Sequence, residues 1–390
     1  MVVCAQTQTP APFPKPPRPA VKPRKVDHTP PALFPVASLW TLALNNMLTV
    51  PAAYDATHAF FAIEGDQLVA YDILSGDQQW LVTARPQFQP AIGDNLLFVV
   101  ESDSLVARNA DDGEVAWEMP LGGKPPVRPA WDNGWLVVST DKGDVLGIRA
   151  SDGHVLWRHD LKSPAHGLPG FAADRVYVST RDRRIVALRI ENGEPIWERH
   201  FIGVPADILA LADRVYAGSS DDYLYCLMPN DGSIDWRWRT GGDIVGAPVT
   251  DGDRVYFVAL DNVLRALDHK SGVQQWMRPL PIRPAWSPLL IGSTVAVAGL
   301  ATSVKGFAIK DGAPAGDFVA TSEVTTAPYA LDDPVLHRPM LLVTTRDIAK
   351  GATATLSGRS FEPPLAPVTP LPNLVQIAPM ASATTTPRPQ

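Results

Sequence analysis

The stretch that decides the fold is Asp268-His269-Lys270-Ser271-Gly272-Val273-Gln274-Gln275-Trp276. A closely similar stretch, Asp72-Ile73-Leu74-Ser75-Gly76-Asp77-Gln78-Gln79-Trp80, lies 196 residues earlier. Both contain a serine and glycine after an aspartate, and both end in a tryptophan four residues after the glycine. Self-similarity of this kind is the sequence signature of a repeat architecture.

The tryptophans follow a ladder with steps of 37 to 40 residues, at Trp40, Trp80, Trp117, Trp157, Trp197, Trp236 and Trp276. A glycine stands four residues before each of the last six, at Gly76, Gly113, Gly153, Gly193, Gly232 and Gly272. A seventh unit keeps Gly312 but has Gly316 where the next tryptophan would fall. Glycine and tryptophan therefore share one register over most of the chain, and the repeat is about forty residues long.

Residues 248–276 show what one unit contains. A short strand from Pro248 is followed by the polar turn 251–254, and the β-branched and aromatic run 255–259 is a buried strand. A second turn, the strand 263–268, a hairpin turn at Gly272 and a last strand ending at Trp276 complete the unit. Four short strands per forty residues, without a helical period, indicate a β-propeller blade.

The ending Asp-x-x-Ser-Gly-x-x-x-Trp resembles the tryptophan-docking motif of the pyrroloquinoline-quinone (PQQ) type propeller repeat, from residue 36 to about 357. WD40 repeats share the period but place Gly-His early and Trp-Asp late. The resemblance implies an eight-bladed propeller, as in quinoprotein dehydrogenases and in BamB, the propeller lipoprotein of the outer-membrane assembly machine. It also implies a structural, blade-docking role for the seven tryptophans of the ladder.

We expect an all-β, eight-bladed propeller of four-stranded blades. Residues 325–356 supply further strands, and the strand around Trp40, which has no inner partners before it, would pair with them and close the ring. Seven blades are the alternative if residues 325–356 form only a cap. The predicted domains are a leader over residues 1–35, the propeller over residues 36–357 and a tail over residues 358–390.

Composition fits one ring with two flexible ends. Of 39 prolines, 18 lie in residues 1–35 and 361–390, so we predict disordered Pro-rich tails. The formal net charge of −7 argues against nucleic-acid binding. No apolar stretch is long enough for a transmembrane helix. We expect a monomer that is peripheral to a membrane at most.

The N-terminus indicates export. Val3-x-Ala5 has the small-residue pattern of a signal-peptidase site, although the basic and most of the apolar region that should precede it are missing. A start codon placed too late would explain this, and the protein would be periplasmic or associated with the outer membrane. Lipidation at Cys4 fits less well, because Val3 precedes it, and an ordinary intracellular N-terminus is the remaining alternative.

Function should lie on loops, because a fold does not specify chemistry. The connections between blades carry the candidate partner-facing residues Arg85, Arg128, Asp243 and Arg283, beside His166 and Asp207. Arg128 and Arg283 each begin the tetrapeptide Arg-Pro-Ala-Trp. Turns between second and third strands add Asp103, Asp141, Asp182, Asp221, Asp222 and Asp261. These residues are either ordinary turn residues or a docking surface for a protein segment or an anionic group.

Catalytic signatures are lacking in the sequence. It has no Cys-Cys pair, which quinoprotein dehydrogenases carry, and no HExxH, GxSxG or phosphate-binding glycine loop. We therefore predict no catalytic, metal or cofactor-binding residues and no cofactor. The expected function is a non-catalytic scaffold for protein–protein interaction in the bacterial cell envelope, of the kind that assists outer-membrane protein assembly. The alternatives are a PQQ-dependent oxidoreductase and a propeller that binds a small ligand.

Overall fold

The computed structural model describes residues 30–334, 337–347 and 351–359. The chain divides into two compact units, residues 1–30 and 31–390, and the description below concerns the second. All regular structure in the described residues is β-strand. The predicted signal-peptidase site, Cys4 and most of both predicted tails lie outside the described residues.

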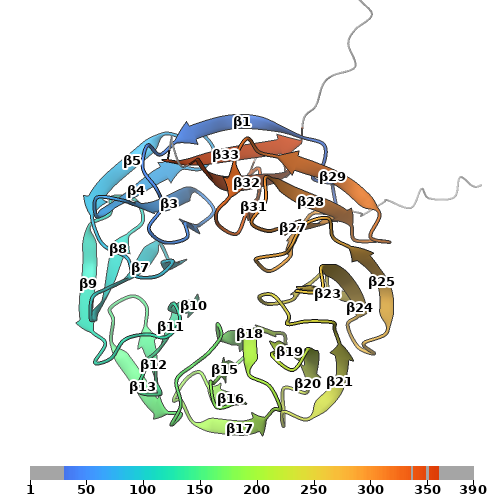
Figure 1. Cartoon of the computed structure of the whole chain (residues 1–390). Helices are drawn as coiled ribbons and strands as arrows, with labels where there is room; N and C mark the ends of the chain where they lie inside the picture. The colour runs from blue at the N-terminus through green and yellow to red at the C-terminus, as the bar shows by residue number, and fades with distance from the viewer. Residues whose placement is uncertain (1–29, 335–336, 348–350, 360–390) are drawn as a thin grey trace, which may run out of the picture. The chain divides into compact units, whose positions relative to one another are not determined.

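Eight β-sheets stand around a central channel, so the described ring is an eight-bladed propeller (Figure 1). Within blades 1 to 7 the four strands are antiparallel and follow chain order from the channel to the perimeter. Blade 1 holds β2 (Ala53–Tyr54), β3 (His58–Ile63), β4 (Gln67–Asp72) and β5 (Gln78–Thr83). Blade 2 holds β6 (Ala91–Gly93), β7 (Leu96–Glu101), β8 (Ser104–Asn109) and β9 (Val115–Pro120). Blade 3 holds β10 (Ala130–Asp132), β11 (Trp135–Ser139), β12 (Asp144–Arg149) and β13 (Val155–Asp160).

The next four blades repeat this arrangement. Blade 4 holds β14 (Gly170–Ala172), β15 (Arg175–Ser179), β16 (Arg184–Arg189) and β17 (Pro195–His200). Blade 5 holds β18 (Pro205–Ala210), β19 (Val215–Ser219), β20 (Tyr223–Leu227) and β21 (Ile234–Arg239). Blade 6 holds β22 (Val249–Thr250), β23 (Arg254–Ala259), β24 (Val263–Asp268) and β25 (Gln274–Pro279). Blade 7 holds β26 (Leu289–Ile291), β27 (Thr294–Ala298), β28 (Ser303–Ala308) and β29 (Pro314–Val319).

Blade 8 closes the ring with strands from both ends of the described chain. It holds β30 (Glu323–Val324), β31 (Tyr329–Asp332), β32 (Pro339–Asp347), β33 (Gly351–Arg359) and, as its outermost strand, β1 (Val36–Ala43). Strand β1 pairs antiparallel with β33, and Trp40 lies opposite Leu356. The prediction of eight blades is confirmed, and residues 325–356 are strands of a blade rather than a cap. Because the ring is closed, every blade has a neighbouring blade on both sides.

Burial along the strands explains the apolar patterns in the sequence. The second and third strands of each blade are covered on both faces by neighbouring blades, so β7 and β23 are almost wholly buried. The fourth strand faces solvent on one side, and β21 alternates between partly buried and exposed positions. The apolar clusters lie between adjacent blades. One of them joins Tyr177 and Trp197 of blade 4 to Ile208 and Ala217 of blade 5.

The tryptophans of the ladder connect each blade to the next. Trp157 belongs to blade 3, and its ring covers Gly193 of the neighbouring blade 4. A Cβ atom added at Gly193 would lie 2.4 Å from this ring. Gly193 also has a φ of 69°, which other residues rarely adopt. The indole Nε1 of Trp157 donates to the carbonyl of Ile190 at 2.6 Å. Each glycine therefore receives the tryptophan of the preceding unit and not the one that follows it in sequence.

The seventh unit lacks its tryptophan, and the N-terminal segment of the ring fills the gap. Gly306 and Gly316 face each other in blade 7, and the ring of Phe34 lies against both, so that added Cβ atoms would approach it to 2.2 and 2.7 Å. Phe34 is 4% exposed and packs in the cluster between blades 7 and 8. The neighbouring Leu33 is fully buried. Residues before the predicted boundary at residue 36 are thus part of the propeller core.

Candidate functional site

The connections between blades and the turns between second and third strands lie on the same face of the ring. Backbone hydrogen bonds join them, from Asp141 to Lys124 at 2.7 Å and from Leu260 to Asp243 at 2.9 Å. The candidates Arg85, Arg128, Asp243 and Arg283 all belong to such connections, between β5 and β6, β9 and β10, β21 and β22, and β25 and β26. We call this face, with these connections and turns, the connection face.

Most aspartates of the connection face hold the loops in place. The carboxylate of Asp261 pairs with Arg265 and accepts a hydrogen bond from the backbone N–H of Gly241 at 2.9 Å. Asp141 accepts from the N–H of Lys124 at 3.1 Å, across the same kind of turn. These contacts fit the interpretation as turn residues, since their oxygen atoms are already used within the ring.

The two Arg-Pro-Ala-Trp tetrapeptides occupy different positions in their blades. Ala130 begins β10 and lies opposite Val137, whereas the corresponding residue of blade 7 is Leu289, opposite Ala296. Arg283 consequently lies four residues earlier in its blade than Arg128 does. The sequence similarity of the two tetrapeptides does not carry over to equivalent sites.

The four candidate residues differ in exposure. Arg85, Asp243 and Arg283 are exposed, and Arg85 is 3.6 Å from Asp66 in a surface ion pair. Arg128 is only partly exposed and contributes to the walls of three neighbouring cavities. Arg128 is therefore the candidate around which the structure builds a site.

The largest of these cavities, the basin, has a volume of about 490 Å³. Residues of the four successive connections from β1–β2 to β13–β14 line it, together with Asp207, which the structure places in strand β18 rather than in a connection; its walls are mostly apolar. They are Thr49, Val50, Pro51, Gln87, Phe88, Gln89, Pro126, Val127, Arg128, Leu168 and Asp207. Burial lowers the pKa of the Arg128 guanidinium, and the carboxylate of Asp207 acts against this shift. The basin thus combines apolar walls with one partly desolvated cation.

A second cavity of about 220 Å³ shares Gln89 and Arg128 with the basin. Its walls include the stacked rings of Tyr54 and Tyr329, whose centroids are 4.7 Å apart, and Trp131. We call it the aromatic cavity. One of its rings is held in place, because the hydroxyls of Tyr54 and Thr344 share a hydrogen bond at 3.0 Å.

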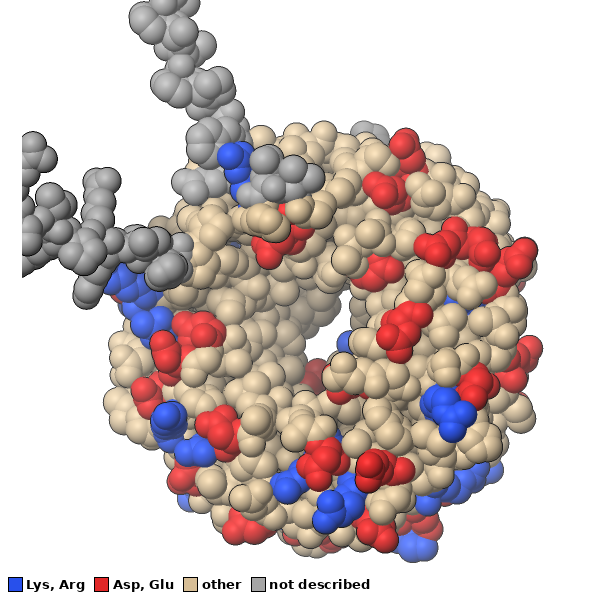
Figure 2. Space-filling model, turned by 180° about the vertical axis from the view of Figure 1, so that it is seen from behind, with Lys and Arg blue, Asp and Glu red and all other residues tan. Residues whose placement is uncertain are grey.

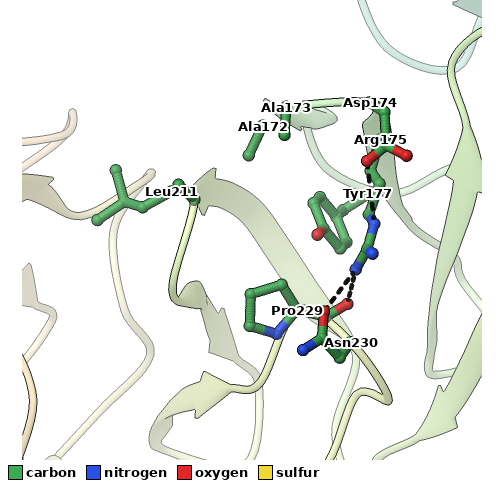
Figure 3. Close-up of a pocket in the computed structure, with 9 residues that line it drawn as sticks. Ala172, Ala173, Asp174, Arg175, Tyr177, Leu211, Pro229 and Asn230 are labelled. Carbon is green, nitrogen blue, oxygen red and sulfur yellow. Dashed lines mark hydrogen bonds and ion pairs between the residues drawn. The ribbon is translucent and has the colours of Figure 1, made fainter.

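The opposite face carries the turns between first and second and between third and fourth strands, and it also has a pocket. Figure 3 shows this pocket of about 80 Å³ between blades 4 and 5, with Arg175 pointing toward Pro229 and Asn230. Arg175 donates to the Pro229 carbonyl and forms an ion pair with Asp174 at 3.3 Å. Because the guanidinium already holds partners from both blades, this pocket is a blade junction.

A space-filling view of one face of the ring shows the central opening, with Asp and Glu scattered among mostly uncharged side chains (Figure 2).

A buried polar chain lies between blades 5 and 6. The Tyr216 hydroxyl donates to the backbone carbonyl of His269 at 2.8 Å and also lies 2.8 Å from Nδ1 of its ring, whose Nε2 lies 2.9 Å from Asp213. The hydrogen bond to His269 lowers the pKa of Asp213. Cys226 lies opposite Tyr216 in the sheet, and burial raises the pKa of its thiol to about 12. Sequence reasoning did not single out these residues, because His269 stands within the repeat motif as an ordinary turn residue.

The described residues contain neither a cluster of metal ligands nor a membrane-spanning helix. No three His, Cys, Asp or Glu side chains within them converge as they would around a metal ion. None of the described elements is a helix long and apolar enough to cross a membrane.

The family model described as "Outer membrane protein assembly factor BamB" matches residues 37–128, 103–211 and 207–334. BamB from Moraxella catarrhalis is similar in structure, with a TM-score of 0.63 and 19% identity over 84% of this chain and 98% of that one. Sqt1 from Saccharomyces cerevisiae has a TM-score of 0.69 and 10% identity over 82% and 98%. A quinohemoprotein alcohol dehydrogenase from Comamonas testosteroni has a TM-score of 0.63 and 10% identity over 83% and 76%. No curated protein sequence matches the chain significantly. At these sequence identities, the similarity to solved structures shows the fold alone.

Proposed function

Since the chain belongs to the BamB family of outer membrane protein assembly factors, we propose that it is a non-catalytic scaffold that binds a protein partner in the bacterial cell envelope. The partner would belong to the machinery that assembles outer-membrane proteins. The protein would be exported and act in the periplasm, as a monomer and peripheral to the membrane at most.

The connection face supports this proposal. It carries a basin of about 490 Å³ with mostly apolar walls, and its connections also bear exposed charges such as Arg85 and Asp243. Protein interfaces commonly combine an apolar centre with a polar rim. Two pockets of the opposite face, of about 80 and 160 Å³, are smaller, and the arginine of the first is already paired. The combination of an apolar basin with exposed charges on one face is the observation that carries the proposal.

The buried thiol of Cys226 also fits a role without catalysis. A cysteine nucleophile reacts as the thiolate, and a pKa of about 12 keeps this thiol protonated near neutral pH. The fold itself is neutral on this point, because propellers of this type occur among both scaffolds and enzymes.

The test uses photo-crosslinking from the two faces. A photoreactive amino acid replaces Asp243 on the connection face or, as the matched control, Asp152 in the turn between β12 and β13 on the opposite face; both aspartates are exposed. Envelope fractions should yield a cross-link to a component of outer-membrane protein assembly from position 243 and none from position 152. Equal labelling from both positions, or none from position 243, would contradict the proposal.

A second measurement addresses the alternative of a quinoprotein. The purified protein is mixed with PQQ and calcium, and the quinone absorbance and the melting temperature are recorded. A non-catalytic scaffold should change neither. A shifted absorbance together with dye reduction on addition of an alcohol would favour the oxidoreductase instead.

A further inference from the structure

Arg128 differs from the other arginines that the ring partly buries. Its guanidinium makes no hydrogen bond and no ion pair within the described ranges, and Asp207 acts on it only through its charge. Arginines that the ring buries further are held by carboxylates or carbonyls: Arg108 by Glu101 and Gly113, Arg184 by Asp182 and Glu198, and Arg265 by Asp261. Arg128 therefore keeps its hydrogen-bond donors available toward the basin.

An unpaired, partly desolvated guanidinium costs folding free energy, and an anion that reaches it offsets this cost. Arginine presents donors in a planar fork that matches the two oxygens of a carboxylate. The nearby Asp207 is partly occupied, because its Oδ1 accepts the backbone N–H of Leu168 at 2.8 Å. The guanidinium of Arg128 thus offers the basin one site for a negatively charged group. The neighbouring carboxylate of Asp207 weakens the attraction of Arg128 for such a group.

The surroundings of Arg128 indicate what the anion is attached to. The basin opens on the connection face, and its apolar wall includes Val50, Phe88 and Val127. On the other side of Arg128 lies the aromatic cavity, with Tyr54 and Tyr329 stacked in its wall. A ligand that fits both spaces carries a carboxylate directly beside an apolar or aromatic side chain. Two successive residues of a peptide provide such neighbours where the backbone turns, because successive side chains of a fully extended strand point to opposite sides.

We propose that the basin binds a segment of a partner protein through a carboxylate side chain that pairs with Arg128, with the adjoining apolar side chain in the aromatic cavity. This inference rests on the proposed function for the nature of the partner. It adds that Arg128 makes the central contact on the connection face and that the partner presents a carboxylate to it.

The test is a peptide titration followed by fluorescence anisotropy. The probes are a labelled, end-blocked pentapeptide Gly-Leu-Glu-Phe-Gly and its Gln counterpart, and benzoate serves as a small free carboxylate. The proteins are the wild type, Arg128→Leu, Asp207→Asn and, as the matched control, Arg283→Leu on the same face. Circular dichroism and melting temperatures verify folding, and Arg128→Leu should melt no lower than the wild type because it loses no partner.

The wild type should bind the Glu peptide, and Arg128→Leu should weaken this binding by about tenfold or more, the usual effect of losing a hydrogen bond to a charged group. Asp207→Asn keeps an oxygen for the Leu168 N–H but removes the opposing charge, so it should strengthen the binding severalfold. Arg283→Leu should leave it unchanged, and the Gln peptide should bind the wild type and Arg128→Leu equally.

Several results would overturn the inference: no discrimination between the Glu and Gln peptides, an equal loss in Arg283→Leu, or Arg128-dependent binding of benzoate without binding of the peptide. Its failure is separable from failure of the proposed function. Cross-linking from position 243 that persists in Arg128→Leu, together with peptides that do not bind, refutes the carboxylate site alone. Peptide binding through Arg128 without any cross-link from position 243 refutes the envelope function alone.

Discussion

Replacing Phe34 by alanine should destabilise the whole ring, although Phe34 lies outside the tryptophan ladder. The side chain is 4% exposed and fills the space over Gly306 and Gly316, neither of which has a side chain that could move into the gap. Phe-to-Ala substitutions in a core cost about 3–5 kcal/mol, and we expect the upper half of this range because the cavity cannot collapse.

The expected change in melting temperature follows from the size of the ring. An unfolding entropy of about 2.1 cal/mol/K per residue over roughly 330 residues is about 0.7 kcal/mol/K. A loss of about 4–5 kcal/mol then lowers the melting temperature by about 6–7 °C. Differential scanning calorimetry and guanidinium unfolding measure this change. Phe34→Leu should fall between the wild type and Phe34→Ala, because it fills part of the space.

The control is Leu39→Ala on the outermost strand β1, where the side chain is 58% exposed. It should change the free energy of unfolding by no more than about 0.5 kcal/mol. If Phe34→Ala melted within 1 °C of the wild type, or no lower than Leu39→Ala, the segment before β1 would not complete the junction between blades 7 and 8, and the reasoning would be refuted.

Three further results are expected. Gly193→Ala should lower the free energy of unfolding by about 2–4 kcal/mol in denaturant titrations, because it combines a positive φ with a clash against Trp157, and a change below about 0.5 kcal/mol would contradict the packing described. Cys226 should resist a thiol reagent at pH 8 in the native protein and react fully in guanidinium, since burial raises its pKa to about 12; rapid native labelling would contradict this. Although burial raises the pKa of Asp261, hydrogen bonds from Arg265 and Gly241 lower it overall, so its contribution to stability is present above the unfolded pKa of about 3.9 and is lost as the pH falls through the lower folded value. Asp261→Asn should therefore be less stable than the wild type at pH 7, and the difference in melting temperature should shrink in acid.

The pattern of local residues determined most of the architecture. Turn chemistry at Gly272 and the apolar run 255–259 predict strands and their lengths, and the spacing of Trp80 and its equivalents predicts the length of the repeat. The number of blades followed from the resemblance to the PQQ-type repeat together with the expected closing strand. The closing strand around Trp40 was predicted correctly as well, because a strand without sequence neighbours must pair elsewhere. These inferences succeed because contacts within a blade join residues that are close in sequence.

Contacts between blades were decided only by the tertiary structure. The sequence places Gly193 beside Trp197, but in the ring it lies under Trp157 of the preceding unit. It places Phe34 in a leader, whereas Phe34 replaces a missing tryptophan almost three hundred residues away in the chain. The contact of Phe34 leaves no periodic signal, because only one of its two partners belongs to the repeat.

The candidate site shows the same division. The sequence alone determined that Arg128 and Arg283 lie on connections between blades, each at the start of an Arg-Pro-Ala-Trp tetrapeptide. The ring places them four residues apart in register; Arg283 is exposed, and Arg128 lines the basin and the aromatic cavity. Exposure, desolvation and the lack of a partner are properties of a side chain's surroundings. Blades 1 to 5 and, through Tyr329, blade 8 supply the surroundings of Arg128, and only the packed ring brings them together.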